Sequence, residues 1–133
     1  MTSTTPTLNA LSIVVDDMDV SLAFYRACGL EFPADAAAPH AETTASGGFR
    51  ILLDTAASVA TFNPDWSPVS GGQRISLAFE CGGPADVDAR YEALTAAGHV
   101  GHLKPFDAVW GQRYATVTDP NGNTVDFYAA HPR

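Results

Sequence analysis

The sequence predicts an α+β protein made of two βαβββ modules, whose curved mixed sheets enclose a shared cup. Three observations indicate this class: a helix-like segment that occurs twice, runs of alternating polarity around each copy, and a turn-rich segment between the two halves. The 133 residues, 46% hydrophobic and 17% charged, have an ordinary globular composition and suffice for one sizeable core. We therefore expect residues 1–133 to form a single domain.

The internal repeat pairs "MDVSLAFYRACGL" at residues 18–30 with "ADVDARYEALTAAGH" at residues 85–99. Phe24 and Tyr91 match across 67 positions, and Gly29 and Gly98 across 69. Each copy has apolar residues at helical spacing, an Asp near its start and a Gly at its end. The repeat therefore predicts two helices in equivalent places.

Short runs typical of β-strands surround each helix. In the first module, about residues 8–62, we expect strands near 8–15, 30–33, 41–53 and 58–62. In the second module, about residues 74–129, we expect them near 74–81, 99–103, 106–118 and 123–128. Residues 63–73, which contain the aperiodic "NPDWSPVSGG", form the expected linker.

Alternation within the strands assigns side chains to faces. The apolar faces are expected to pack on the helices and carry Leu11, Ile13, Val15, Ile75, Leu77, Phe79, Cys81, Ala115, Val117, Val125 and Phe127. The opposite faces would then line a common hollow that contains Ser76, Tyr114 and Asp126. A carboxylate on a half-buried strand needs a partner, so Asp126 indicates a ligand group, a cation or a local hydrogen bond to the backbone or Thr118.

Charge and composition narrow the partners. The 7 Lys and Arg residues stand against 15 Asp and Glu, and the net charge of −8 argues against nucleic acid and anionic membranes while permitting a cationic small ligand. The chain begins without an apolar signal region and contains no run of roughly 18 to 20 apolar residues, so we expect a cytoplasmic protein. Cys28 and Cys81 lack CxxC spacing and are expected to be buried hydrophobes.

The histidines do not form an evident catalytic or metal-binding set. His99 and His102 would point to opposite faces of a strand, so we expect them to be exposed rather than joint metal ligands. His40 and His131 have no evident base or nucleophile partner. The sequence contains no phosphate-binding loop, nucleophile elbow or Cys–His pair.

The aromatic residues offer a different chemistry. Trp110 and Tyr114 share strand parity with Gln112, and Trp66 lies in the linker between Asp65 and Ser67. These positions are unusual for core residues, although core packing is the alternative. With Phe49 and Phe62, they predict the walls of a pocket for a flat, apolar or cationic molecule.

The order of three segments resembles the vicinal oxygen chelate superfamily, which includes glyoxalase I, extradiol dioxygenases, and fosfomycin-resistance, bleomycin-resistance and mitomycin-binding proteins. The segments are "IVVDDMDVSLAFYRACGLEF", "ISLAFECGGPADVDARYEALTAAGH" and "WGQRYATVTDPNGNTVDFY". The resemblance covers about residues 8–129. It implies a glyoxalase/bleomycin-resistance-like fold, in which each curled sheet contributes to a ligand site, usually in a homodimer.

The resemblance also implies where a metal would bind. Metal-dependent members have a His or Glu opening the first strand of each module and a Glu or Gln on each last strand. The matching positions here are Ala10, Ala60, Ser76 and Asp126, and the pairs 10/76 and 60/126 are both 66 apart. One carboxylate and one hydroxyl are too few donors for zinc, magnesium or manganese. We therefore expect no metal site and no cofactor.

We interpret the sequence as a metal-free protein that binds and sequesters an antibiotic or planar natural product, as the drug-binding resistance proteins do. Trp110, Tyr114 and Trp66 would stack on the ligand near Phe49 and Phe62, Gln112 and Ser76 would hydrogen-bond it, and Asp126 would accept from a ligand donor. Two alternatives stay open. In the first, the protein is an enzyme of the same fold: a lyase, transferase or dioxygenase that has displaced metal ligands or uses Asp126 as base. In the second, it is a small subunit whose hollow is occupied by side chains of its partner.

Overall fold

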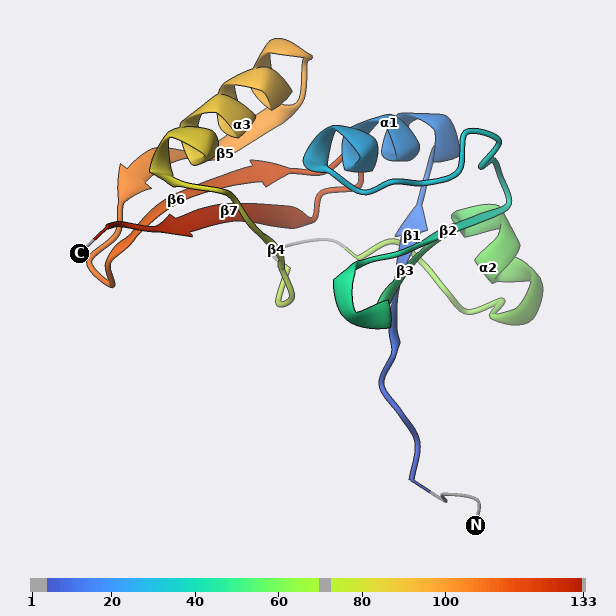
Figure 1. The fold of residues 1–133 in the computed structure, drawn as a ribbon. Helices are drawn as coiled ribbons and strands as arrows, with labels where there is room; N and C mark the ends of the chain where they lie inside the picture. Colours follow the sequence, from blue (N-terminus) through green and yellow to red (C-terminus); the bar gives the residue numbers. More distant parts are fainter. Residues whose placement is uncertain (1–4, 70–72, 133) are drawn as a thin grey trace.

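The computed structural model describes residues 5–69 and 73–132 and contains two β-sheets that share one helical layer (Figure 1). The first sheet contains β1 (Ala10–Val15), β2 (His40–Thr44) and β3 (Arg50–Thr55), in the order β1-β3-β2. The second contains β4 (Leu77–Glu80), β5 (Val100–Asp107), β6 (Gln112–Thr118) and β7 (Thr124–Ala130), in the order β4-β7-β6-β5. The pairs β1/β3 and β4/β7 are parallel and the others antiparallel, so the predicted α+β class with mixed sheets is confirmed.

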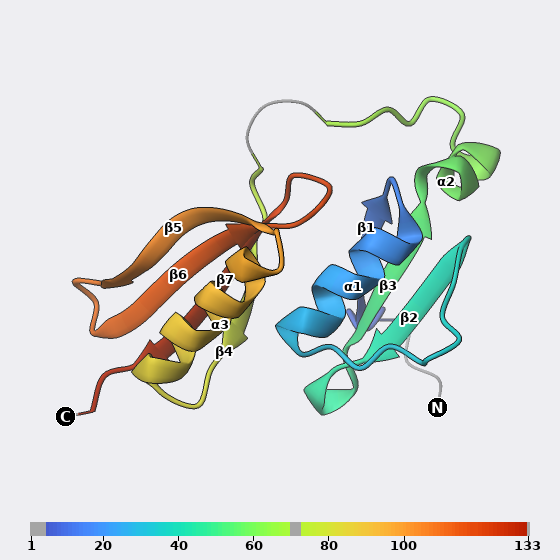
Figure 2. The same ribbon diagram turned by 90° about the horizontal axis from the view of Figure 1, so that it is seen from above.

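Both predicted helices form, and they lie side by side over the sheets (Figure 2). Helix α1 (Met18–Cys28) begins where the Asp17 side chain accepts from the Val20 backbone N–H, and it ends at Gly29, whose φ of 114° favours glycine. Helix α3 (Pro84–Ala96) begins with a proline, which needs no helical partner there. Among the described residues, no helix combines the length and apolarity that a membrane crossing requires.

One hydrophobic core connects the helices with the covered faces of both sheets. Phe24 and Tyr25 of α1 are fully buried, and the Phe24 ring meets His99 edge-on with centroids 4.9 Å apart. The predicted inward positions Ala115, Val117, Val125 and Phe127 are also buried. Ile75 differs from the prediction, because it precedes β4 and is 71% exposed. His99 is half-buried, whereas His102 is exposed as expected.

The first sheet has three strands, and none of them is the strand expected at residues 30–33, which does not form. Pro33 and Pro39 lie in the segment before β2, and a proline nitrogen has no hydrogen to donate to a sheet ladder. Phe32 nevertheless packs into the core and is 6% exposed. The segment therefore crosses the molecule as a loop anchored by one aromatic side chain.

Two other expectations for this half of the chain were wrong. The segment 41–53 is divided into β2 and β3 by a short 3₁₀ turn at Ser46–Gly48, where Gly47 has a φ of 80°. Residues 58–62 belong to helix α2 (Ala56–Phe62), not to a strand. Thr55 caps this helix by accepting from the Ser58 backbone N–H, and the alanine-rich sequence favours helix over strand.

The turn before β7 ties the two halves of the chain together. The Asp119 carboxylate is almost fully buried and accepts from the Tyr25 hydroxyl at 2.5 Å and from the backbone N–H groups of Asn121 and Asn123, both at 2.8 Å. Asn121 in turn accepts from the Asp16 backbone N–H and donates to Ser21. These contacts join α1 to the end of the second sheet and fix the position of the turn.

Candidate functional site

The face of the second sheet turned away from α3, here called the open face, carries two rows of paired side chains. The first row runs across the four strands as Phe106, Tyr114, Tyr128 and Glu80. The second runs as Leu103, Thr116, Asp126 and Ala78. Because side chains alternate along a strand, the buried residues between these positions face the core. The pairing register therefore places an aromatic row directly beside a carboxylate.

Three aromatic rings meet at the β5–β6 end of the open face. The ring centroids of Trp110 and Tyr114 are 5.5 Å apart at 81°, and those of Phe106 and Tyr114 are 5.9 Å apart at 61°. Phe106 and Trp110 are 6.3 Å apart at 89°. Such edge-to-face contacts hold the rings in fixed orientations. Trp110 is 58% exposed, so much of its surface stays open to a ligand.

Asp126 has protein partners on both carboxylate oxygens. Tyr114 donates to Oδ2 at 2.6 Å and Thr116 donates to Oδ1 at 2.8 Å. Two side chains of the neighbouring strand therefore bond to Asp126, and neither of them was identified as a partner from the sequence. A ligand donor to the same carboxylate stays a prediction. Burial and the adjacent carboxylate raise the pKa of Tyr114 to about 12, so the phenol keeps its proton at neutral pH.

Gln112 and Ser76 also form hydrogen bonds with other residues of the protein. The Trp110 indole N–H donates to Gln112 Oε1 at 2.8 Å, which leaves the amide nitrogen of Gln112 for other contacts. Ser76 lies just before β4 and bonds the backbone oxygen and hydroxyl of Thr124. Both side chains are thus positioned by their neighbours near the open face.

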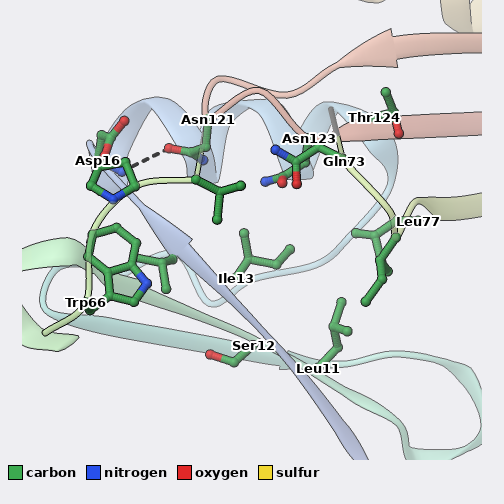
Figure 3. Close-up of a pocket in the computed structure, with 14 residues that line it drawn as sticks. Leu11, Ser12, Ile13, Asp16, Trp66, Gln73, Leu77, Asn121, Asn123 and Thr124 are labelled. Atoms are coloured by element: carbon green, nitrogen blue, oxygen red, sulfur yellow. Dashed lines mark hydrogen bonds between the residues drawn. The ribbon is translucent and has the colours of Figure 1, made fainter. Parts of the chain in front are cut away.

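The other three predicted site residues lie elsewhere. Trp66 lines a pocket between β1 and β4 (Figure 3), and none of Trp110, Gln112, Tyr114 and Asp126 belongs to its lining. Phe49 lines a second groove, together with Phe79 and Tyr128. Phe62 ends α2 and is 74% exposed. The structure therefore brings together four of the eight predicted residues, with Ser76 at the margin.

The sequence and the fold can be compared with known proteins. Residues 7–127 match the family model of the Glyoxalase/Bleomycin resistance protein/Dioxygenase superfamily. The chain belongs to this superfamily. A search of curated proteins gives no significant match.

Solved structures of superfamily members share the fold. A glyoxalase/bleomycin resistance protein/dioxygenase from Nocardioides is 24% identical over 98% of this chain and 87% of its own, with a TM-score of 0.74. A family enzyme from Burkholderia phytofirmans PsJN is 17% identical over 94% and 99%, with a TM-score of 0.80. A glyoxalase-related enzyme from Fulvimarina pelagi is 18% identical over 92% and 87%, with a TM-score of 0.78. At these identities the likeness establishes the fold.

The metal site that this superfamily implies does not fit the residues present. Ala60 lies on α2, so it cannot be the last-strand position of the first half. Strand pairing identifies the correct position. Ser12 and Ala78 are equivalent residues of the two halves, 66 positions apart. Ala78 pairs with Asp126 and Ser12 pairs with Leu52, so Leu52 is the first-half counterpart of Asp126. The four positions are therefore Ala10, Leu52, Ser76 and Asp126, with a single carboxylate whose oxygens already have donors. Among the described residues, no three His, Cys, Asp or Glu side chains form a metal-binding group.

Sequence reasoning missed a polar network on the corresponding face of the first sheet. Asp54 accepts from Ser12 at 3.0 Å and lies 2.6 Å from His40 Nδ1, while Arg50 donates to Glu42 at 2.8 Å. The hydrogen bond with Asp54 raises the pKa of His40. Correct boundaries for β2 and β3 would have revealed it, because the register pairs His40 with Asp54. The predicted site also left out Phe106, Tyr128 and Thr116. Alternation alone places Tyr128 and Thr116 on the face of Tyr114 and Asp126, whereas the place of Phe106 follows from its pairing with Tyr114.

Proposed function

We propose that the protein binds and sequesters a flat, apolar or cationic small molecule, of the antibiotic or natural-product type, on the open face without a metal. The observation that carries this proposal is the fixed cluster of Phe106, Trp110 and Tyr114 beside the Asp126 carboxylate. Aromatic faces bind flat rings and attract cations through their quadrupoles. A resident carboxylate adds charge attraction to a ligand donor.

The two rows of the open face favour a cation over an anion. They contain two carboxylates, Glu80 and Asp126, and no Lys or Arg. The net charge of −8 acts in the same direction at longer range. An anionic ligand would have to lose its hydration beside acidic groups, which costs free energy. A planar cation is therefore the ligand class that these residues support best.

A matched series of acridines tests the proposal. We expect the planar cation 9-aminoacridine to bind more tightly than neutral acridine, and acridine-9-carboxylate to bind least, in fluorescence titrations at neutral pH. Trp110→Ala should weaken 9-aminoacridine binding by about 1 to 3 kcal/mol through loss of a stacking surface. Trp66→Ala is the control, because Trp66 lies in a different pocket. Absence of binding by all three compounds would overturn the proposal.

Asp126→Asn separates charge recognition from shape. The variant should lose about 1 to 3 kcal/mol of 9-aminoacridine binding, because a charged hydrogen-bond acceptor is replaced by a neutral one. Binding of neutral acridine should change little. Equal losses for both compounds would mean that Asp126 supports the pocket only through Tyr114 and Thr116.

Metal independence distinguishes this proposal from a metal-dependent enzyme of the same superfamily. We expect EDTA to leave both the melting temperature and 9-aminoacridine affinity unchanged, because the four family ligand positions offer one carboxylate. A stoichiometric transition metal with Asp126 among its ligands would contradict the proposal. Turnover of a superfamily substrate by the metal-depleted protein would instead favour a metal-free enzyme.

The proposal includes a homodimer in the cytoplasm. Exposed apolar side chains on β5 and in the β5–β6 turn support an interface there: Val109 is 100% exposed and Val100 64%. The superfamily resemblance and the uncovered sheet edges support it further. The unpaired Cys28 and Cys81 are in keeping with a reducing compartment. A monomer at micromolar concentration in sedimentation would count against the dimer.

A further inference from the structure

A pocket of about 280 Å³ lies at the seam between β1 of the first sheet and β4 of the second. We call it the seam pocket. Figure 3 shows Trp66 and Asp16 at one end, Leu77 at the other, and Asn121, Asn123 and Gln73 along one side. The sites of small molecules are often such clefts between structural units, mainly apolar with a few polar groups. The volume is near the lower end of the usual range, so it suits a compact ligand.

The hydrogen bonds of the turn leave the seam pocket rich in acceptors. Asn121 uses its oxygen for the Asp16 backbone N–H at 2.9 Å and its nitrogen for Ser21 at 3.1 Å. Asn123 donates from Nδ2 to Asp119 at 2.9 Å. Within the described parts of the chain, no protein group donates to Asn123 Oδ1 or to the carboxylate of Asp16, which is an exposed residue. A ligand that enters here therefore meets unused acceptors and needs N–H donors of its own.

The charge and the shape of the lining point to the same chemistry. Asp16 is the one charged residue among the described residues of the lining, which includes no Lys or Arg. Trp66 is half-buried and offers an indole face to a flat ring, while Ile13 and Leu77 supply apolar contacts. Because Asn121 and Asn123 are held by the buried turn, the polar side is fixed before a ligand arrives.

We propose that the seam pocket is a second ligand site, separate from the open face, for a compact aromatic ring that carries an amidinium or similar N–H-rich cationic group. The ring stacks on Trp66, and the cationic group donates to Asp16 and to Asn123 Oδ1. The proposal does not depend on the open-face function, because the two sites share none of Trp66, Asp16, Trp110 and Asp126.

Three probes of equal shape test the ligand class: benzamidine, benzamide and benzoate. In ¹⁵N-labelled full-length protein, the two indole N–H signals are assigned with Trp66→Phe and Trp110→Phe. We expect benzamidine to move the Trp66 signal and the side-chain amide signals of Asn121 and Asn123. A shift of the Trp110 signal would report separate binding at the open face. Benzamide should bind about tenfold more weakly, and benzoate should cause no shift up to about 10 mM.

Two variants with matched controls test the residues. Asp16→Asn should weaken benzamidine about tenfold and leave benzamide unchanged, while Asp65→Asn, which makes the same charge change outside the lining, should alter neither. Trp66→Ala should abolish the benzamidine shifts, whereas Trp66→Phe should retain part of the affinity. The dispersion of the amide spectrum verifies that each variant is folded.

Several results would overturn the inference. Benzoate binding as tight as benzamidine binding would contradict the proposed charge preference. Unchanged benzamidine affinity in Trp66→Ala would show that the ring does not stack on Trp66. Shifts confined to the Trp110 signal, or no shift with any probe, would mean that the seam pocket is not a ligand site. The Trp110 signal reports 9-aminoacridine binding at the open face, and the Trp66 signal reports binding in the seam pocket. The two proposals can therefore be rejected independently.

Discussion

Replacement of Tyr25 by Phe tests the contact that holds the two halves of the chain together. The Tyr25 hydroxyl is fully buried and donates to Asp119 Oδ2 at 2.5 Å. A hydrogen bond to a charged group contributes about 1.5 to 3 kcal/mol to stability. The Asp119 carboxylate keeps three other donors in the variant: the backbone N–H groups of Asn121 and Asn123, and Asn123 Nδ2. The cost should therefore stay below the 3 to 5 kcal/mol typical of an unpaired buried charge.

We expect Tyr25→Phe to lower the free energy of unfolding by about 2 kcal/mol. For a chain of this length, that loss corresponds to roughly 6 to 10 °C in melting temperature. The measurement is urea unfolding followed by tryptophan fluorescence, with a thermal melt as a second probe. Tyr128→Phe is the control, because Tyr128 is half-buried and no described residue accepts from its hydroxyl, so its cost should be within about 0.5 kcal/mol.

A double-mutant cycle between Tyr25→Phe and Asp119→Asn tests the pairing itself. Residues in one hydrogen-bond network couple by about 0.5 to 3 kcal/mol, so the two losses should not add. Equal stability of Tyr25→Phe and Tyr128→Phe, or strict additivity in the cycle, would refute the reasoning. The turn that carries Asn121 and Asn123 would then be held by its own geometry rather than by α1.

Three further predictions concern positions outside the ligand sites. A methyl group at Gly101 would overlap the Tyr91 hydroxyl and approach Cζ to 2.8 Å, so Gly101→Ala should cost about 1 to 3 kcal/mol in urea unfolding, except in a Tyr91→Ala background. Burial raises the pKa of Cys28 from 9.0 to about 12, which favours the neutral thiol in the folded state. The contribution of this group to the free energy of unfolding is fully present below pH 9 and is lost as pH rises towards 12. In Cys28→Ala, the free energy of unfolding should therefore fall less steeply with pH in this range. An NMR titration should give His40 a pKa above 6.5, and Asp54→Asn should lower this pKa, because the Asp54 hydrogen bond is the main cause of the increase. The contribution of His40 to the free energy of unfolding is present below pH 6.5 and is lost as pH rises through the folded-state pKa.

The sequence determined the features that depend on local spacing. The helical periods, the Asp at each start and the Gly at each end located α1 and α3, and strict alternation identified the buried faces of β6 and β7. The alternation also placed Tyr114, Gln112 and Asp126 on one face. Such patterns are readable because a helix or strand repeats its side-chain direction at a fixed interval.

Local propensity failed where a short segment fits more than one kind of structure. The run "SVATF" is short and β-branched in part, but Thr55 caps a helix there, so α2 forms. Phe32 was expected on a strand, and it is buried without one. In both places, the outcome depended on a cap or a tertiary contact that periodicity does not record.

Only the tertiary structure decided which residues meet. Asp126 was recognised from the sequence as a carboxylate that needs partners, but Tyr114 and Thr116 became those partners through the β6–β7 register. Trp66 and Trp110 were grouped by residue type, yet the chain path places them in different sites. The seam pocket likewise depends on the buried bond between Tyr25 and Asp119, which are 94 residues apart. Sequence spacing specifies the direction of each side chain along its own element, whereas packing and strand register determine its neighbours.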